Sequence, residues 1–175
     1  MAGLHRLHAR GFKWALTVDG DGQHAAADIP MFLTHAATRS SALIVGNRML
    51  NALCMPWLRR RVNVWMSRRL SRLVGRDLPD SQCGFRMFPL SVWSTLPLQT
   101  THFEFESELL LAFIAAGQDV EFVPIQAIYR SEHSKINVVP DSWRWLRWWW
   151  KVSSRHRKMD FGARTRQKTS TPPCL

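Results

Sequence analysis

The chain has 175 residues, of which 46% are hydrophobic and 21% are charged, and this balance is typical of one folded domain. The formal net charge is +11, and nine tryptophans stand against a single tyrosine. The positive charge favours polyanionic partners such as nucleic acid, an anionic membrane surface or phosphorylated substrates. Tryptophan occurs at membrane interfaces, in cores and on base-stacking surfaces, so composition alone leaves all three partners open.

The cysteine content and the hydropathy of the chain indicate in which cellular compartment the protein is expected. The cysteines Cys54, Cys83 and Cys174 are odd in number and contain no C-x-x-C pair, which argues against a disulfide framework and a zinc cluster. The longest strongly apolar stretch, residues 109–116, is far shorter than the roughly 18 residues that a membrane span needs. The first residues contain no apolar signal-peptide core. We therefore expect a cytoplasmic location and no membrane-crossing segment.

The first half of the chain predicts a strand, a turn, a helix and a second strand. Residues 12–18 are apolar and β-rich and run directly into Asp19-Gly20-Asp21-Gly22, which predicts a buried strand that ends in a turn. Asp28 then caps a helix that has Pro30 in its first turn. Residues 41–45 predict a second short strand, which stops at Gly46.

The second half predicts two helices and a third strand before a tryptophan-rich segment. From about residue 56 to residue 74 the apolar residues recur at helical spacing, and Gly75 suits the C-terminal stop. Residues 105–116 predict another helix, ended by Gly117, and residues 120–129 return to strand. Because strands alternate with helices, we expect an α/β sheet domain.

The acidic turn carries the strongest chemical signal. Two carboxylates, Asp19 and Asp21, lie one residue apart on a glycine-rich turn at a strand end. Such a pair can bind one Mg²⁺ or Mn²⁺, whose remaining positions are filled by water and phosphate oxygens. Gln23 could add a neutral oxygen ligand. A D-x-D pattern also arises by chance, and turns use Asp and Gly, so this spacing alone leaves a purely structural turn open.

Several blocks in a fixed order strengthen the functional interpretation. The run WALTVDGDGQH resembles the metal-binding strand end of family 2 glycosyltransferases, especially dolichyl- and polyprenyl-phosphate sugar transferases. Later blocks resemble the same family in the same order, namely GNR, an arginine-rich helix, DSQCGFRMF, FEFESELLLAFIAAGQDVEFVPIQAIY, and SKI before the tryptophan-rich helix. The resemblance covers most of residues 10–150.

This resemblance implies a fold and a reaction. The implied fold is GT-A, the Rossmann-like fold of nucleotide-diphospho-sugar transferases, and the implied reaction is an inverting, metal-dependent transfer to a polyprenyl phosphate. Asp19, Asp21 and Gln23 would hold Mg²⁺ or Mn²⁺ on the diphosphate of the sugar nucleotide. One departure is Ala25-Ala26, where relatives often carry an acidic residue and proline. We expect this departure to alter only the entry into the following helix.

Arginines suit the acceptor side of such a reaction. A phosphate acceptor is already an oxyanion, so it needs positioning more than deprotonation, and the planar fork of arginine pairs with two phosphate oxygens. By resemblance, Arg48, Arg59 and Arg86 are the expected acceptor-phosphate residues. Arg60 and Arg61 are explained equally well by a solvated helix face.

One carboxylate after the arginine-rich helix is the candidate catalytic residue. By resemblance, Asp80 lies near the sugar or acts as a base, although a loop-capping role is open from the residues alone. Cys83 is expected to pack rather than to act as a nucleophile, because no histidine is placed to activate it. Glu106, at the start of a helix, is a weaker candidate.

The tryptophan-rich segment predicts an interfacial helix. On a helical wheel, Arg144, Arg147 and Lys151 fall within an arc of roughly 60°, and tryptophans fill most of the remainder. This pattern predicts a helix lying in the plane of a membrane surface, with rings at headgroup level and cations on anionic lipid. Packing on its own domain is the alternative. The candidate membrane residues are Trp143, Trp145, Arg147, Trp148, Trp149 and Lys151.

We divide the chain into a partial GT-A domain over residues 1–140, the interfacial helix over 141–158 and a disordered basic tail over 159–175. Family members place a base- and ribose-binding segment before the acidic turn, but only 18 residues precede Asp19 here. We therefore expect an N-terminally truncated, weakly active protein whose parallel sheet lacks its first strands and exposes an edge. A truncated gene, a misplaced start codon and a separate partner chain are three explanations.

Other classes of function remain to be weighed. A family 2 transferase with a non-lipid acceptor is the nearest rival, and a non-enzymatic membrane-surface adaptor would explain the charge and tryptophans but not the ordered blocks. Nucleic-acid binding is disfavoured, because the arginines are scattered between an acidic turn and a separate aromatic helix rather than forming one continuous face. The expected partners are a sugar nucleotide, a polyprenyl phosphate, the inner face of the cytoplasmic membrane and a membrane protein or separate N-terminal half.

Overall fold

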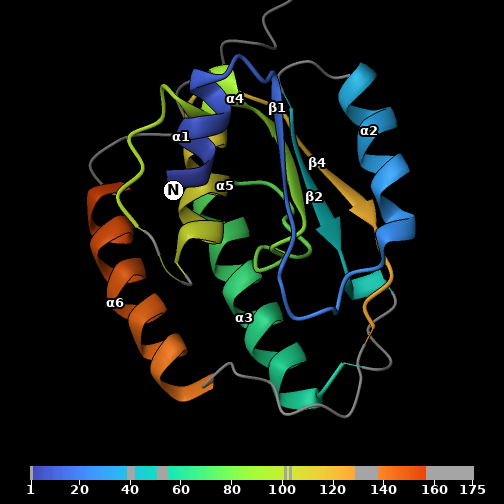
Figure 1. Cartoon of the computed structure of the whole chain (residues 1–175). Coiled ribbons are helices and arrows are strands. Elements are labelled where there is room, and N and C mark those ends of the chain that lie inside the picture. Colours follow the sequence, from blue (N-terminus) through green and yellow to red (C-terminus); the bar gives the residue numbers. More distant parts are fainter. Residues whose placement is uncertain are drawn as a thin grey trace, which may run out of the picture.

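The protein folds as a mixed α/β structure in which helices cover both sides of a four-stranded sheet (Figure 1). The structure is a computed structural model that describes residues 2–38, 42–50, 55–100, 102, 104–128 and 138–156. The elements in chain order are α1 (Ala2–Ala9), β1 (Trp14–Thr17), η1 (Ala26–Asp28), α2 (Ile29–Thr38), β2 (Leu43–Asn47), α3 (Trp57–Val74), β3 (Arg86–Pro89), α4 (Leu90–Trp93), α5 (Phe105–Ala115), β4 (Val120–Pro124) and α6 (Val138–His156).

The sheet is mixed rather than parallel, which corrects the expected parallel sheet. Its strand order is β1-β3-β2-β4, with β2 parallel to β4 and β3 antiparallel to both β1 and β2. Trp14 pairs with Pro89 and Thr17 with Arg86 along β1 and β3. Sequence analysis missed β3, because its four residues lie inside a block that was interpreted as a site segment. The α/β class is confirmed.

Strand β2 forms the centre of the core. Leu43, Ile44 and Val45 are fully buried, as expected for a strand that is covered on both faces and therefore reads as a continuous apolar run. Figure 1 shows α2 on one side of the sheet and α3 and α5 on the other, with α6 on the outer side of α3. Phe32 of α2 stacks on Phe85 just before β3, with ring centroids 4.3 Å apart.

Two loops are brought close to the carboxyl end of β2 by a glycine. A Cβ atom at Gly46 would lie 2.6 Å from Cδ1 of Ile125 and 3.1 Å from Sγ of Cys83, so a side chain here would push both segments away. The Gly46 amide donates to the Phe85 carbonyl at 2.9 Å. Glycine at this position therefore lets the segment before β3 and the segment after β4 meet where the acidic turn also lies.

Helix α3 matches its expected bounds within a residue. It begins after Pro56 and ends at Gly75, whose φ of 69° is left-handed and whose amide donates to the Ser71 carbonyl. The buried positions Asn63, Met66, Ser67 and Leu70 recur at helical spacing. The opposite face of α3 is rich in arginine and faces outward.

Helix α6 packs on the domain through its tryptophans, which corrects the assignment of Trp145 to a membrane contact. Trp145 is fully buried, its indole N–H donates to Oγ of Ser107 at 2.9 Å, and its ring meets Trp65 edge-on. Trp149 stacks on Trp145 at 5.4 Å between centroids, and Trp148 is also half-buried. The aromatic surface is therefore divided between an inner and an outer face.

The outer face of α6 carries both apolar and basic residues. Trp143 is 64% exposed and Trp150 is 77% exposed. Arg147, which lies between them in the sequence, and Lys151, which follows Trp150, are also exposed. None of the described helices is both long enough and apolar enough to span a bilayer. Residues 159–175, the predicted disordered tail, lie outside the described residues, and the proposed domain division stays a prediction.

Replacing Trp145 by phenylalanine is expected to destabilise the protein by about 1–3 kcal/mol. The change removes the indole N–H from Ser107 and leaves a gap between α3, α5 and α6. Trp150→Phe is the matched control and should change stability by less than about 0.5 kcal/mol, because its ring is exposed. Urea unfolding followed by circular dichroism measures both, and equal effects would refute the packing role of Trp145.

Candidate active site

The acidic turn follows β1 and is shaped by its own side chains. Gly22 has a φ of 70°, and the Gln23 amide donates to Oδ1 of Asp21 at 3.0 Å, which closes the turn locally. Thr17, the last residue of β1, donates from Oγ1 to the Gly84 carbonyl at 2.9 Å. The turn is therefore attached to the segment before β3, which sequence analysis placed in a different block.

Asp19 is held from two sides by residues that sequence reasoning did not single out. Nε2 of His24 lies 3.1 Å from Oδ2 of Asp19, and the His24 side chain is almost completely buried against Phe85. On the other side, a Cβ at Gly84 would lie only 2.1 Å from Oδ1 of Asp19. Only glycine at position 84 admits the carboxylate in this position.

The charge state of Asp19 suits a cation ligand. The hydrogen bond from His24 lowers the pKa of Asp19, and although burial opposes this, the charges of His24, Arg48 and Arg86 lower the pKa further. The carboxylate is therefore ionised at neutral pH. Its side chain is still 46% exposed, so it remains accessible to a ligand.

Gln23 joins the acidic turn to α3. Nη1 of Arg59 donates to Oε1 of Gln23 at 2.9 Å. A predicted metal ligand and a predicted acceptor-phosphate residue are thus brought into direct contact, 36 residues apart in the sequence. A carbonyl oxygen has two lone pairs, so this contact leaves Oε1 a second lone pair.

Asp80 and Arg48 form a buried ion pair rather than two separate site residues. The Asp80 side chain is fully buried and accepts from the backbone N–H, Nε and Nη2 of Arg48 at 3.0, 2.8 and 2.9 Å. Nδ2 of Asn63 donates to Oδ1 of Asp80 at 2.8 Å. Burial alone would raise the pKa of Asp80, but the Arg48 charge and these hydrogen bonds outweigh burial, so the pKa is lowered.

The Asp80–Arg48 pair bears on the predicted catalytic role of Asp80 and on the predicted phosphate-binding role of Arg48. In the structure, the Asp80 carboxylate binds Arg48 and Asn63 and is covered from solvent, so its geometry is that of a positioning group. The catalytic role of Asp80 and the phosphate role of Arg48 stay predictions.

Arg86 is buried, which corrects its assignment to the acceptor phosphate. Its guanidinium donates to the backbone carbonyls of Ser81, Cys83 and Glu106, and only 1% of the residue is exposed. These contacts fasten the segment before β3 to the start of α5. Arg86 therefore positions the loop that carries Gly84 and does not reach solvent.

Cys83 behaves as expected from the sequence. Its thiol is buried, and burial raises the pKa of Cys83 to about 12, so it is not ionised at neutral pH. Glu106 is partly buried, and burial raises its pKa despite the nearby Arg86 charge. Its Oε2 has no hydrogen-bond partner among the described residues. A carboxyl in this environment is a candidate that the sequence pattern only weakly marked.

The assembled site, at the end of β1, combines the carboxylates of Asp19 and Asp21 with the amide oxygen of Gln23 and the guanidinium of Arg59. Across the described ranges, no three His, Cys, Asp or Glu side chains gather as a metal cage made of protein alone. A Mg²⁺ or Mn²⁺ site needs only one or two carboxylates, since water and phosphate oxygens complete it. The arrangement can therefore hold a cation together with a phosphorylated ligand.

Comparison with known proteins finds relatives that are named as sugar transferases. The chain is 31% identical over 134 residues to a UDP-N-acetylglucosamine–dolichyl-phosphate N-acetylglucosaminyltransferase of Methanococcus voltae, covering 74% of this chain and 53% of that relative. It is 25% identical over 133 residues to a low-salt glycan biosynthesis hexosyltransferase of Haloferax volcanii, covering 74% of this chain and 32% of that relative.

A further relative is an uncharacterised protein of Methanocaldococcus jannaschii, 28% identical over 122 residues, which are 67% of this chain and 50% of the relative. No protein-family model matches the chain. The chain thus spans about half or less of the length of these curated relatives. The resemblance to polyprenyl-phosphate sugar transferases is confirmed, and the chain is homologous to named sugar transferases.

Proposed function

We propose that this chain carries the catalytic portion of a glycosyltransferase that moves a hexose from a nucleotide-diphosphate donor to a polyprenyl phosphate. Two relatives are named as hexose or N-acetylglucosamine transferases, and one name includes both a UDP-sugar and dolichyl phosphate. The observation that carries the proposal is the acidic turn at the end of β1. Its Asp19 is fixed by His24 and by the close approach of Gly84, and its Gln23 contacts Arg59.

The acidic turn fits a divalent cation by its chemistry. Asp19 is ionised and accessible, and Asp21 is exposed beside it, so two hard oxygen ligands are offered at one turn. Asp19 and Asp21 would hold Mg²⁺ or Mn²⁺, and Oε1 of Gln23 would contribute its second lone pair. When bound, the cation supplies charge neutralisation for the departing diphosphate.

Arg59 is the best-placed arginine for a phosphate group. It lies at the start of α3, is only partly buried, and already reaches the acidic turn through Gln23. A guanidinium at this place can orient the phosphate oxygens of donor or acceptor without proton transfer. Arg48 and Asp80 form a separate buried pair that fixes the backbone after β2.

The finer features of the proposal follow the family resemblance. We propose a GT-A type of domain of family 2 and an inverting single displacement, in which the acceptor phosphate oxygen attacks the anomeric carbon as the nucleoside diphosphate leaves. We also propose a peripheral location on the inner face of the cytoplasmic membrane. The exposed Trp143, Arg147, Trp150 and Lys151 of α6 support this location, because they combine aromatic and basic side chains on one outward face.

A transfer assay tests the proposal. The purified chain is incubated with Mn²⁺, a labelled UDP- or GDP-sugar and a short polyprenyl phosphate, and the label is then counted in the organic phase. Label in the organic phase is the expected result, and the donor that yields it identifies the base. Transfer only to water-soluble acceptors would refute the lipid acceptor, and transfer to neither kind of acceptor would contradict an active catalytic portion.

His24 gives a second test that does not depend on turnover. Replacing His24 by phenylalanine keeps a ring against Phe85 but removes the hydrogen bond to Asp19. We expect Mn²⁺ affinity to fall roughly 10- to 100-fold, the range found when groups behind a metal ligand are removed. Electron paramagnetic resonance of free Mn²⁺ measures this. Unchanged affinity would contradict the role of His24 in orienting Asp19, and His5→Phe on α1 is the matched control.

A further inference from the structure

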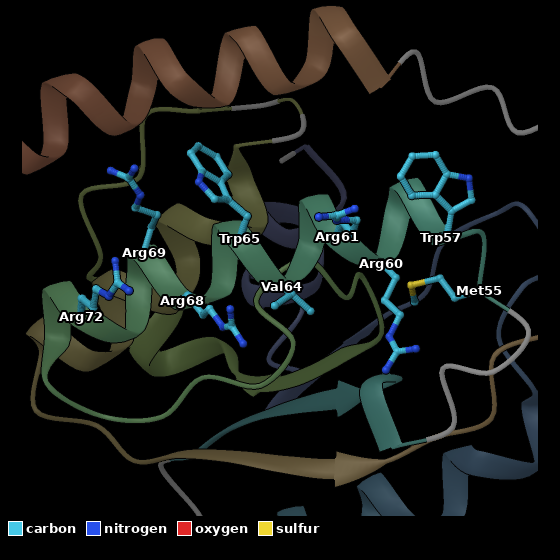
Figure 2. Close-up of a pocket in the computed structure, with 9 residues that line it drawn as sticks. All are labelled: Met55, Trp57, Arg60, Arg61, Val64, Trp65, Arg68, Arg69 and Arg72. Carbon is cyan, nitrogen blue, oxygen red and sulfur yellow. The ribbon is translucent and has the colours of Figure 1, made fainter.

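The outward face of α3 carries two parallel rows of side chains, each with a spacing of four residues (Figure 2). One row consists of Trp57, Arg61, Trp65 and Arg69, and the other consists of Arg60, Val64, Arg68 and Arg72. Residues four apart are neighbours on a helix surface, so each row forms a continuous ridge. The two ridges enclose a surface groove of about 750 Å³, which we call the α3 groove.

In the first row, arginine and tryptophan are paired. The guanidinium carbon of Arg61 lies 6.0 Å from the ring centroid of Trp57, and that of Arg69 lies 5.1 Å from Trp65. These cation–π contacts hold the guanidinium groups over flat apolar surfaces. Cationic groups and apolar rings are thereby presented together toward solvent, with Trp57 68% exposed.

The charge of the groove is not neutralised by the protein. Helix α3 contains no acidic residue. None of the five groove arginines forms an ion pair with a carboxylate in the part of the chain that the structure describes. All five are exposed, and guanidinium groups pair with phosphate oxygens through two parallel hydrogen bonds. These exposed cations are available to an anion from solution, and phosphate is an anion that fits the planar guanidinium groups.

We propose that the α3 groove is a docking surface for the anionic headgroups of a lipid bilayer. A bilayer offers many phosphates in one plane next to an apolar layer, and the groove offers five guanidinium groups next to two exposed tryptophans. Such rings favour the depth of the headgroups, where one end is apolar and the other wet. The α3 groove adds a second basic and aromatic surface to the outer face of α6.

The position of α6 supports a membrane over a nucleic acid. Trp65 points from the groove toward α6, where it contacts the buried Trp145 (Figure 2). Beyond this contact, α6 carries the exposed Trp143 and Trp150, the latter among the most exposed large apolar side chains of the described chain. Single-stranded nucleic acid would stack its bases on aromatic rings along one strand path. Here the exposed tryptophans are spread over two helices, which suits an extended surface better than one strand.

Vesicle binding tests this inference without any sugar donor or acceptor, so its result is independent of the proposed transfer. The full chain is mixed with vesicles of phosphatidylcholine alone or with phosphatidylglycerol added, and the bound fraction is measured by sedimentation. The groove variant replaces Arg60, Arg68 and Arg72 by glutamine, which keeps helix propensity nearly unchanged. The control variant replaces Arg6, Arg10 and Lys13, three exposed cations on and after α1, by glutamine.

We expect the wild type to bind only the anionic vesicles. Each basic residue near the surface contributes about a five-fold factor, so the groove variant should bind roughly a hundred-fold more weakly. The control variant loses the same net charge but keeps the groove arginines. It should therefore bind within about three-fold of wild type, if binding depends on where the positive charges lie. Thermal melting establishes that both variants are folded.

Three results would overturn the proposal. Equal losses in the groove and control variants would show that net charge alone attracts the protein. Absence of wild-type binding to anionic vesicles would show that the α3 groove does not dock on a bilayer. Groove-dependent binding of polyuridylic acid without vesicle binding would assign the groove to nucleic acid instead.

Discussion

Replacing Asp21 by asparagine is expected to reduce sugar transfer by about a hundred-fold or more, with little effect on stability. Asparagine keeps the shape of the side chain, and its oxygen can still accept from the Gln23 amide. The substitution removes one of the two charges that we propose to hold the cation against the diphosphate, and electrostatic groups of this kind each contribute about 10²–10³ in rate. Label recovered in the organic phase per unit time measures the effect.

The matched control is Asp77→Asn, which removes another exposed carboxylate, in the loop after α3. Its rate should equal that of the wild type. If Asp21→Asn transfers sugar as fast as the control, then the acidic turn has only the structural role that its spacing also allows, and the proposed function loses its main support.

Replacing Asp80 by asparagine is expected to destabilise the fold by about 3–5 kcal/mol, the cost of breaking a buried ion pair from one side. The substitution removes the buried carboxylate charge that faces the Arg48 guanidinium, although Asn63 and the Arg48 backbone can still form hydrogen bonds. Guanidinium chloride unfolding at pH 7 measures the loss. A loss below about 1 kcal/mol would show that the pair is not a stability element.

The pH dependence of the same pair has a definite sign. The pKa of Asp80 is lower in the folded protein than the ordinary value of 3.8, so the unfolded chain takes up the proton first as pH falls. The stability from Asp80 is therefore fully present above the unfolded pKa and is lost as pH falls through the folded pKa. The free-energy difference between wild type and Asp80→Asn should stay constant from pH 7 to about 5 and shrink below about 4. A difference that grows on acidification would contradict the assigned direction.

The sequence predicted the long and strongly periodic elements well. Helix α3 was expected from residue 56 to 74 and is found at Trp57–Val74, because its buried positions recur at helical spacing and Gly75 ends it. Helix α5 and strand β4 begin where they were expected, although β4 ends at Pro124 rather than near residue 129. Residues 125–128, which were also expected to be strand, form only an isolated bridge between Ala127 and His24.

The missed elements depend on contacts that only the fold creates. Strand β3 has four residues and no alternation of its own, and it forms because it pairs with both β1 and β2. The burial of Trp145 was missed for a related reason. The helical wheel of α6 is aromatic on most sides, so the sequence could not tell which side α3 and α5 would cover.

In the candidate site, too, residues within one motif were predicted from the sequence, whereas contacts created by the fold were not. Asp19, Asp21 and Gln23 were found because they lie within one short motif. The roles of His24 and Gly84 depend on atoms brought together by the fold, at 3.1 Å from Asp19 and at the place where a Cβ would collide with it. Arg86 was assigned to a phosphate because its residue type fits one, whereas its buried guanidinium instead fastens a loop to α5.

The central claim is that the acidic turn binds a divalent cation together with a nucleoside diphosphate, and Mn²⁺-induced broadening of amide signals tests it most directly. Mn²⁺ and UDP or GDP are added to the isotope-labelled chain, and the two-dimensional amide spectrum is recorded. The account predicts that broadening begins at Asp19 through His24 and at Gly84, and that it disappears in Asp21→Asn. Broadening that begins instead at other exposed carboxylates, such as Asp77 or Asp119, would contradict the account.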